Sequence, residues 1–290
     1  MNTIKLYSNL DKSIRPFVVG LLANLAIALL KFGIASLGGS KLVLMDGLFS
    51  FMAAAVFLIP WQAQVIEQKP HDEKYPYGLG KVLFISMVVV GFLGLVISAH
   101  MLFYSLVVMT GLQMRGLYTL AIMVTIISII TNEVLYRYFK EKSQSSSNTM
   151  LVLAGRYNRI GAWISSFVLL FLVLAFLGAT YLERAGVAIV SIVVFFVGLR
   201  MIFVGFSGIM DKVPSAKILN RIRTCAQKIS EVKDIVNIKA RHVGTLLHID
   251  MWISIDETVS IAQADRVARN VKLQLMEKIP SAKEVNIIIT

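Results

Sequence analysis

The 290-residue sequence has few of the residues that build disulfides and metal clusters. It contains a single cysteine, Cys225, which excludes an intrachain disulfide and a cysteine-based metal cluster within one chain. It also has only four histidines. No glycine-rich phosphate loop, nucleophile triad or redox motif occurs in it. These absences argue against a conventional enzyme and against a resident cofactor.

Charge is also scarce, at 16% of residues where an average soluble domain has about 25%. Hydrophobic residues make up 57% of the chain, and its mean hydropathy is +0.73. This balance excludes disorder and indicates a membrane protein with the lipid bilayer as its surroundings. Basic residues outnumber acidic ones by 29 to 17. In a membrane protein this excess marks cytoplasmic loops, so we expect no nucleic-acid partner.

Six apolar runs are long enough to cross a bilayer core, which needs about 20 residues per helix. Basic residues gather before the first run, between the second and third, and between the fourth and fifth. The positive-inside rule therefore predicts an inner (cytoplasmic) membrane protein with both termini in the cytoplasm. The serines at 143 and 145–147 predict a flexible connection. The six runs are 16–36, 42–66, 82–110, 117–135, 160–182 and 185–210.

The composition changes after Asp211, where charges become dense and no run is long enough to span. Helical and alternating apolar patterns follow in the order α-β-β-α-β, which predicts a small cytoplasmic α+β domain. We therefore expect an all-helical transmembrane domain over 1–210 and a second domain over 211–290. The five elements are expected at 216–229, 236–240, 246–255, 261–276 and 285–289.

Seven short motifs occur in order on this topology. Each is weak alone, and their order and spacing make them specific for a fold. They are Asn24 with Lys31 and Gly39-Ser40; Asp46-Gly47 with Ser50; the segment 75–81, Tyr-Pro-Tyr-Gly-Leu-Gly-Lys; the segment 157–165, Tyr-Asn-Arg-Ile-Gly-Ala-Trp-Ile-Ser; Met210-Asp211; 238–241 with Gly244; and 262–265.

Together these motifs resemble the cation diffusion facilitator family, over nearly the whole chain. The resemblance implies a proton-coupled cation exporter that works by alternating access. It also implies a homodimer and a metallochaperone-like C-terminal domain that regulates or dimerises. Lys81 and Asp211 match positions that form a charge interlock between the third and sixth helices of the family.

The metal ligands of the family are missing from this sequence. The resemblance implies two ligand pairs, each at i and i+4, which share one helix face. They fall at Phe49 and Ala53, and at Tyr157 and Gly161, where no carboxylate or imidazole stands. At the family's peripheral sites only Asp72 and Asp265 remain as weak metal candidates. A divalent transition metal is therefore a doubtful cargo.

Asp46 is the only acid deep in an apolar run, and an intramembrane carboxylate is a functional hypothesis by default. Asp46 and Ser50 form an i, i+4 pair, and Tyr157 and Asn158, with Ser165, could face them. Such an oxygen site suits a monovalent cation, a proton or an organic ammonium. The alternative is that Asp46 is a hydrogen-bonded packing residue. Lys31 either extends toward the membrane surface or pairs with Asp46.

Two functions from different classes remain open on the sequence. The first is a cation transporter with a degenerate divalent-metal site, or an exporter of a different cation such as an organic one. The second is a non-transporting regulatory or structural paralogue that pairs with an active transporter. The persistence of the scaffold motifs favours the first, and the loss of the ligand pairs favours the second.

Overall fold

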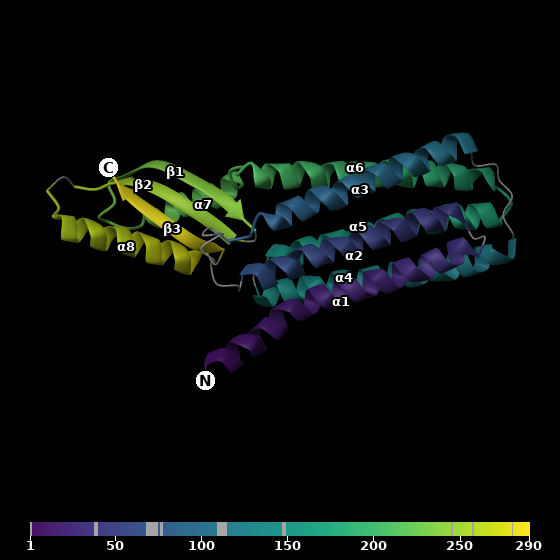
Figure 1. Cartoon of the computed structure of the whole chain (residues 1–290), viewed down its shortest axis with the longest axis horizontal. Helices are drawn as coiled ribbons and strands as arrows, with labels where there is room; N and C mark the ends of the chain where they lie inside the picture. The colour runs from purple at the N-terminus through teal and green to yellow at the C-terminus, as the bar shows by residue number, and fades with distance from the viewer. Residues whose placement is uncertain are drawn as a thin grey trace. The chain divides into compact units, whose positions relative to one another are not determined.

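The computed structural model of the chain forms two compact units (Figure 1). Unit 1 comprises Met1–Lys69 and Ser86–Val204, and unit 2 comprises Pro70–Ile85 and Gly205–Thr290. The division after residue 210 expected from the composition stays a prediction. The residues that the structure describes are 2–37, 40–67, 75, 78–108, 115–146, 149–244, 246–256, 258–279 and 281–290.

Within these residues, six helices are long and apolar enough to cross a membrane, as predicted. Five of them extend beyond the predicted apolar runs at one end or both, because hydropathy detects only the part of a helix that lies in lipid. The serine connection was wrongly predicted up to Ser146, which ends a helix; Ser147 lies outside the described residues. The helices are α1 (Asn2–Ser36), α2 (Lys41–Glu67), α3 (Val82–Phe103), α4 (Arg115–Ser146), α5 (Thr149–Phe176) and α6 (Tyr181–Ile209), with a π-helical turn η1 (Tyr104–Val108) after α3.

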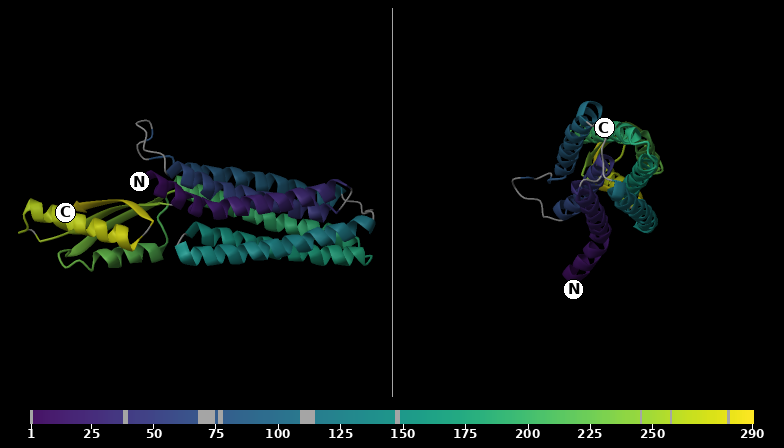
Figure 2. Two further views of the ribbon diagram at one scale, coloured as in Figure 1. Left: turned by 90° about the horizontal axis from the view of Figure 1, so that it is seen from below. Right: turned by 90° about the vertical axis from the view of Figure 1, so that its right-hand side faces the viewer.

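Helices α1, α2, α4 and α5 pack along one another, as both Figure 1 and Figure 2 show. Two buried apolar clusters stabilise unit 1. The Phe139 cluster consists of Phe17, Phe57, Leu135, Phe139, Leu151 and Ala154. The Val168 cluster consists of Leu42, Val43, Met45, Phe49, Met52, Tyr118, Ala121, Ile164, Val168, Leu172, Ala175, Val187, Val190 and Val194.

Helices α3 and α6 approach each other at two glycines. A Cβ atom added to Gly91 would lie 2.7 Å from the carbonyl oxygen of Gly198, and one added to Gly198 would lie 2.8 Å from the carbonyl oxygen of Gly91. Small residues allow such close backbone contact between membrane helices, where dispersion forces drive packing. Both positions therefore require glycine.

Unit 2 contains the predicted α-β-β-α-β fold around a sheet of order β1-β2-β3. β1 pairs antiparallel with β2, and β2 pairs parallel with β3. Alternate residues of β2, such as Ile249 and Met251, are buried against the two helices. Ser260 and Gln263 form a capping box that starts the second helix. The elements are α7 (Ala216–Ala226), β1 (Asp234–Val243), β2 (Leu246–Ser254), α8 (Ile261–Lys278) and β3 (Ala282–Ile289).

Candidate functional site

A buried ion pair joins α1 to α2 in the interior of unit 1. The Nζ atom of Lys31 lies 2.6 Å from Oδ2 of Asp46, and both side chains are fully buried. Lys31 therefore pairs with Asp46 and does not extend toward the membrane surface. A buried ion pair persists only when further hydrogen bonds satisfy both charges, so the groups around it decide its strength.

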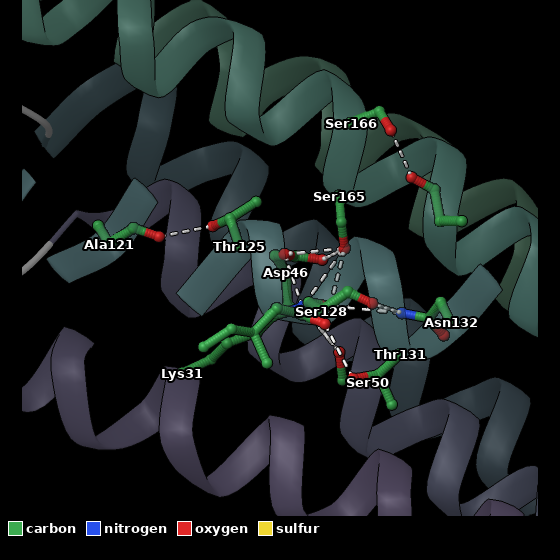
Figure 3. Close-up of polar contacts among 12 residues, drawn as sticks. Lys31, Asp46, Ser50, Ala121, Thr125, Ser128, Thr131, Asn132, Ser165 and Ser166 are labelled. Carbon is green, nitrogen blue, oxygen red and sulfur yellow. Dashed lines mark hydrogen bonds and ion pairs between the residues drawn. The ribbon is translucent and has the colours of Figure 1, made fainter. Parts of the chain in front are cut away.

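The hydroxyls of two serines complete the surroundings of the Lys31 ammonium. Besides Asp46, Nζ donates to Oγ of Ser50 at 3.0 Å and to Oγ of Ser165 at 3.4 Å. Ser165 in turn donates to Oδ1 of Asp46 at 2.9 Å, and Ser50 donates to the backbone carbonyl of Asp46 at 3.0 Å. Figure 3 shows these side chains pointing toward one another from three helices. All three N–H donors of the ammonium thus have an acceptor.

Helix α4 adds a row of polar side chains that the sequence analysis missed. Oγ of Ser128 lies 3.2 Å from Oγ of Ser165, and the Asn132 amide donates to the backbone carbonyl of Ser128 at 3.0 Å. Thr125 lies one turn before Ser128 and donates to the carbonyl of Ala121 (Figure 3). Thr125, Ser128 and Asn132 are buried. Their spacing of three and four residues places them on one face of the helix, and this pattern in an apolar run could have indicated a buried polar row.

The structure brings together three of the five residues of the predicted oxygen site, namely Asp46, Ser50 and Ser165. Asp46 and Ser50 share the ion-pair network, whereas Asn158 is engaged elsewhere. Its Oδ1 accepts a hydrogen bond of 3.2 Å from Asn24 on α1, and its amide donates to a backbone carbonyl of its own helix. In the part of the chain that the structure describes, no hydrogen bond or ion pair joins Tyr157 to the network. The structure therefore does not bring Tyr157 and Asn158 to the Asp46 network, and their part in a cation site stays a prediction.

The positions that match the family's metal ligands are packed with carbon and amide groups. Phe49 and Ala53 are buried, each at 2% exposure. A Cβ atom added to Gly161 would lie 3.4 Å from the Phe49 ring and 3.0 Å from Oδ1 of Asn132. Among the described residues, no group of three or more His, Cys, Asp or Glu side chains is close enough to hold a metal ion. These positions thus provide no tetrahedral ligand set.

On α4 the ion-pair network lies between the two apolar clusters, whereas on α2 the Val168 cluster extends past Asp46 to Phe49 and Met52. On α4 the order is Tyr118 of the Val168 cluster, then Ser128, then Phe139. On α5 the order is reversed, from Leu151 through Ser165 to Val168, because the two helices are antiparallel. The polar centre (Lys31, Asp46, Ser50 and Ser165) is therefore surrounded by the Val168 cluster, and the Phe139 cluster lies beyond it on α2, α4 and α5.

The predicted interlock lies within unit 2 and has a third member. Nζ of Lys81 lies 3.1 Å from Oδ2 of Asp211, and Nη1 of Arg241 lies 3.2 Å from the same oxygen. Asp211 has a positive φ of 55°, in the left-handed region that Asp tolerates better than most residues. Arg241 was part of a sequence motif, but nothing in the sequence indicated this contact.

The two weak metal candidates outside the bundle gain no support as a site. Asp72 lies outside the described residues. Asp265 forms an ion pair with Arg269 one turn later on α8, with the Arg269 Nε donating at 3.0 Å. Its charge is therefore already partnered within its own helix.

Comparison with known proteins gives matches along almost the whole chain. Residues 17–210 match the family model described as the cation efflux transmembrane domain, and residues 214–289 match the cytoplasmic domain of cation efflux proteins. Magnetosome protein MamB of Paramagnetospirillum magneticum is 24% identical over 92% of this chain and 90% of its own length. The manganese efflux system protein MneP of Bacillus subtilis is 24% identical over 92% of both chains. A solved structure of a MamM CTD variant in its nickel form is 24% identical and covers 26% of this chain and 96% of its own, with a TM-score of 0.26.

Proposed function

Because the chain belongs to the cation efflux family, we propose that it is a proton-coupled cation transporter whose cargo binds at Asp46 in exchange for the Lys31 ammonium. The observation that carries this proposal is the buried pair, with 2.6 Å between Nζ and Oδ2. The relatives include a protein named for manganese efflux, which supports transport of a cation as the general function. The chemistry of the centre supports a proposal for the class of cation.

The cargo class follows from the oxygens that now surround the ammonium. Asp46, Ser50 and Ser165 offer one carboxylate and two hydroxyls. This set holds a single negative charge and contains no imidazole or thiolate, so it favours a monovalent cation or a small organic ammonium over a transition metal. Lys31 is itself an alkyl ammonium bound there, which is the closest chemical likeness to an organic cation that the molecule offers.

The charge of the centre supports proton coupling. A cation cannot join Asp46 while the Lys31 ammonium stays in place, because a second positive charge in a buried centre would lack a partner. If the ammonium gives up one proton and one monovalent cation takes its place, the net charge is unchanged. The exchange is then one cation for one proton.

Two buried apolar clusters near the centre support alternating access. In the described arrangement the Val168 cluster surrounds the centre and the Phe139 cluster lies beyond it toward one end of the helices. We infer that one cluster opens at a time. The charge of the loops supports cytoplasmic termini in an inner membrane. The match of residues 214–289 to the family's cytoplasmic domain supports that domain as the contact in a homodimer.

The test is transport by the purified protein in liposomes with a pH-sensitive dye inside. Sodium, potassium, methylammonium, manganese and zinc are offered in turn, and cation-driven proton movement is recorded. We expect D46N to abolish the movement and S165A to reduce it about tenfold, with S166A as the matched control. Ser166 neighbours Ser165 but donates to a carbonyl of its own helix. Flux unchanged in D46N would overturn the site.

A second function is favoured by a different observation. The Phe49 ring and the Asn132 amide pack beside Gly161, where the family places ligands, and the lone central carboxylate is occupied by Lys31. A non-transporting paralogue that pairs with an active transporter would have these properties. It predicts that none of the five cations drives proton movement, and that the chain co-purifies with an active family member.

A further inference from the structure

A second buried carboxylate lies at the start of α6, beside the Val168 cluster of unit 1. Glu183, in the first turn of α6, is 2% exposed. Its Oε1 accepts a hydrogen bond of 2.5 Å from Oγ of Ser40, just before α2, and its Oε2 accepts one of 2.7 Å from the hydroxyl of Tyr118 on α4. Helix α5, which shares the Val168 cluster with α6, has no ionisable residue over 160–176. One side chain thus joins three helices at this end.

The charged groups around Glu183 are engaged elsewhere. Nζ of Lys41 on α2 lies 5.8 Å from the ring centroid of Tyr104 in η1. Arg184 on α6 donates to two backbone carbonyls of η1. The side chain of Arg115 on α4 lies outside the described residues. Among the described side chains, none with a positive charge lies within ion-pair distance of Glu183. This contrasts with the fully paired carboxylate of the polar centre.

The hydrogen bonds of Glu183 fit both of its protonation states. Ser40 accepts a bond of 3.1 Å from the backbone N–H of Leu42, which leaves its own hydroxyl to donate to Glu183. Tyr118 has its recorded side-chain hydrogen bond with Glu183 alone among the described residues, and its hydroxyl can donate or accept there. It donates to the carboxylate and accepts from the carboxylic acid. A proton can therefore bind Oε2 without displacement of any heavy atom.

The three helices joined at Glu183 also supply the Val168 cluster. Val187 and Val190 follow Glu183 by one and two turns on α6, Leu42 follows Ser40, and Ala121 follows Tyr118 by one turn. Hydrogen bonds to an ionised acceptor are roughly twice as strong as neutral ones. The ionised form of Glu183 therefore holds the Val168 cluster closed more tightly than the protonated form.

We propose that Glu183 is a second proton-binding site of this protein, at which the coupling proton enters or leaves the bundle and releases the Val168 cluster. The assignment rests on the proposed transport function, because it names the carboxylate that couples proton binding to opening. The site takes a proton shared between Oε2 of Glu183 and the hydroxyl of Tyr118. Ser40 stays a donor throughout and acts as a positioning residue.

The first test is infrared spectroscopy of the full-length protein in liposomes, titrated from alkaline to acidic pH. We expect a carbonyl band of a protonated carboxylic acid that E183Q removes, that Y118F shifts, and that E133Q leaves unchanged. Glu133 is the matched control because Arg137 and Arg159 pair with its carboxylate. A band unaffected by both E183Q and Y118F would overturn the proposal. If E183Q fails to fold, the result for Y118F alone decides the test.

The second test measures cation-driven proton movement in the same liposomes. We expect E183Q to reduce it at least tenfold while E133Q matches the wild type. If the wild type transports and proton movement in E183Q is undiminished, the role of Glu183 is overturned and the proposed transport function stands. Absence of flux in the wild type, together with a band that E183Q removes, overturns the transport function and leaves Glu183 as a proton site.

Discussion

The Nζ atom of Lys31 and the Oδ2 atom of Asp46 lie 2.6 Å apart at a point where neither side chain is exposed. Each charge is therefore the main stabilising partner of the other. Removal of one partner leaves an uncompensated charge in the interior, whereas removal of both leaves no charge there. The energies of the two charges are thus coupled. This coupling affects the free energy of unfolding independently of transport.

The first prediction concerns the Lys31–Asp46 pair. K31M and D46N should each lower the free energy of unfolding by about 3–5 kcal/mol, the usual cost of breaking a buried pair. The double variant K31M/D46N should lose less than either single variant. Thermal unfolding in one detergent measures all four proteins. Additive losses in the double variant would show that the two charges act independently.

The second prediction concerns metal. Purified wild-type protein, washed with a chelator and then dialysed against zinc, should retain far less than one equivalent, because Phe49, Ala53 and Gly161 offer no ligand atoms. The variant F49D/A53D/Y157H/G161D should retain about one equivalent by elemental analysis. The half-site variant F49D/A53D is the control and should bind weakly. Stoichiometric zinc in the wild type would contradict the ligand positions assigned from the motifs.

The third prediction concerns the contact of α3 with α6. G198A places a methyl group 2.8 Å from the carbonyl oxygen of Gly91, so the helices must separate. We expect a loss of about 1–3 kcal/mol in unfolding free energy, as for other overpacked interiors. G33A is the matched control, because a Cβ there has no neighbour within 4 Å. Equal stability of G198A and G33A would refute the close contact.

The fourth prediction separates charge from backbone strain at Asp211. D211N, D211G and D211A all remove the carboxylate that binds Lys81 and Arg241. Partly exposed pairs contribute about 1 kcal/mol or less, so D211N should be only slightly destabilised. D211A should be about 1 kcal/mol less stable than D211G, because alanine at a φ of 55° is strained. Chemical denaturation orders the three variants, and an alanine variant as stable as the glycine variant would argue against strain.

The fifth prediction concerns pH and unit 2. Burial lowers the pKa of His242 and of His248, although for His248 the Glu284 carboxylate, 2.9 Å away, opposes the effect. A lowered pKa means that the folded state resists protonation. The stability is therefore complete above about pH 6.5 and falls as the pH drops below it.

The measurement uses Trp252 fluorescence in a W61F/W163F background, which leaves one tryptophan, on β2. The thermal midpoint should be lower at pH 5.5 than at pH 7.5. The decrease should shrink in H242Q/H248Q. An identical decrease in both proteins would assign the pH dependence to other groups.

Much of the fold was predictable, because apolar length and alternation are local properties of the sequence. The same patterns misplaced helix ends, since α4 continues through polar residues to Ser146. The pairing of Lys31 with Asp46 could not be decided in advance. Periodicity gives the face of a single helix, and the rotation of α1 against α2 depends on packing that no local pattern records.

The errors at the candidate site have the same origin. Asn158 was expected to face Asp46, but it lies seven residues, or about 10 Å along the helix, before Ser165, and at that level its neighbour is Asn24. Glu183 was missed because it falls in a short connection between two apolar runs. Only the structure brings Ser40 and Tyr118, 143 and 65 residues away in sequence, to its oxygens.

The equal and opposite charges of Lys31 and Asp46 also determine how membrane voltage acts on this protein. One elementary charge that crosses the membrane gains or loses about 2.3 kcal/mol per 100 mV. A pair of net charge zero that moves as a unit experiences no such work, and neither does the exchange of one monovalent cation for one proton. Voltage then drives transport in neither direction, and the concentration gradients of the two ions alone set its course.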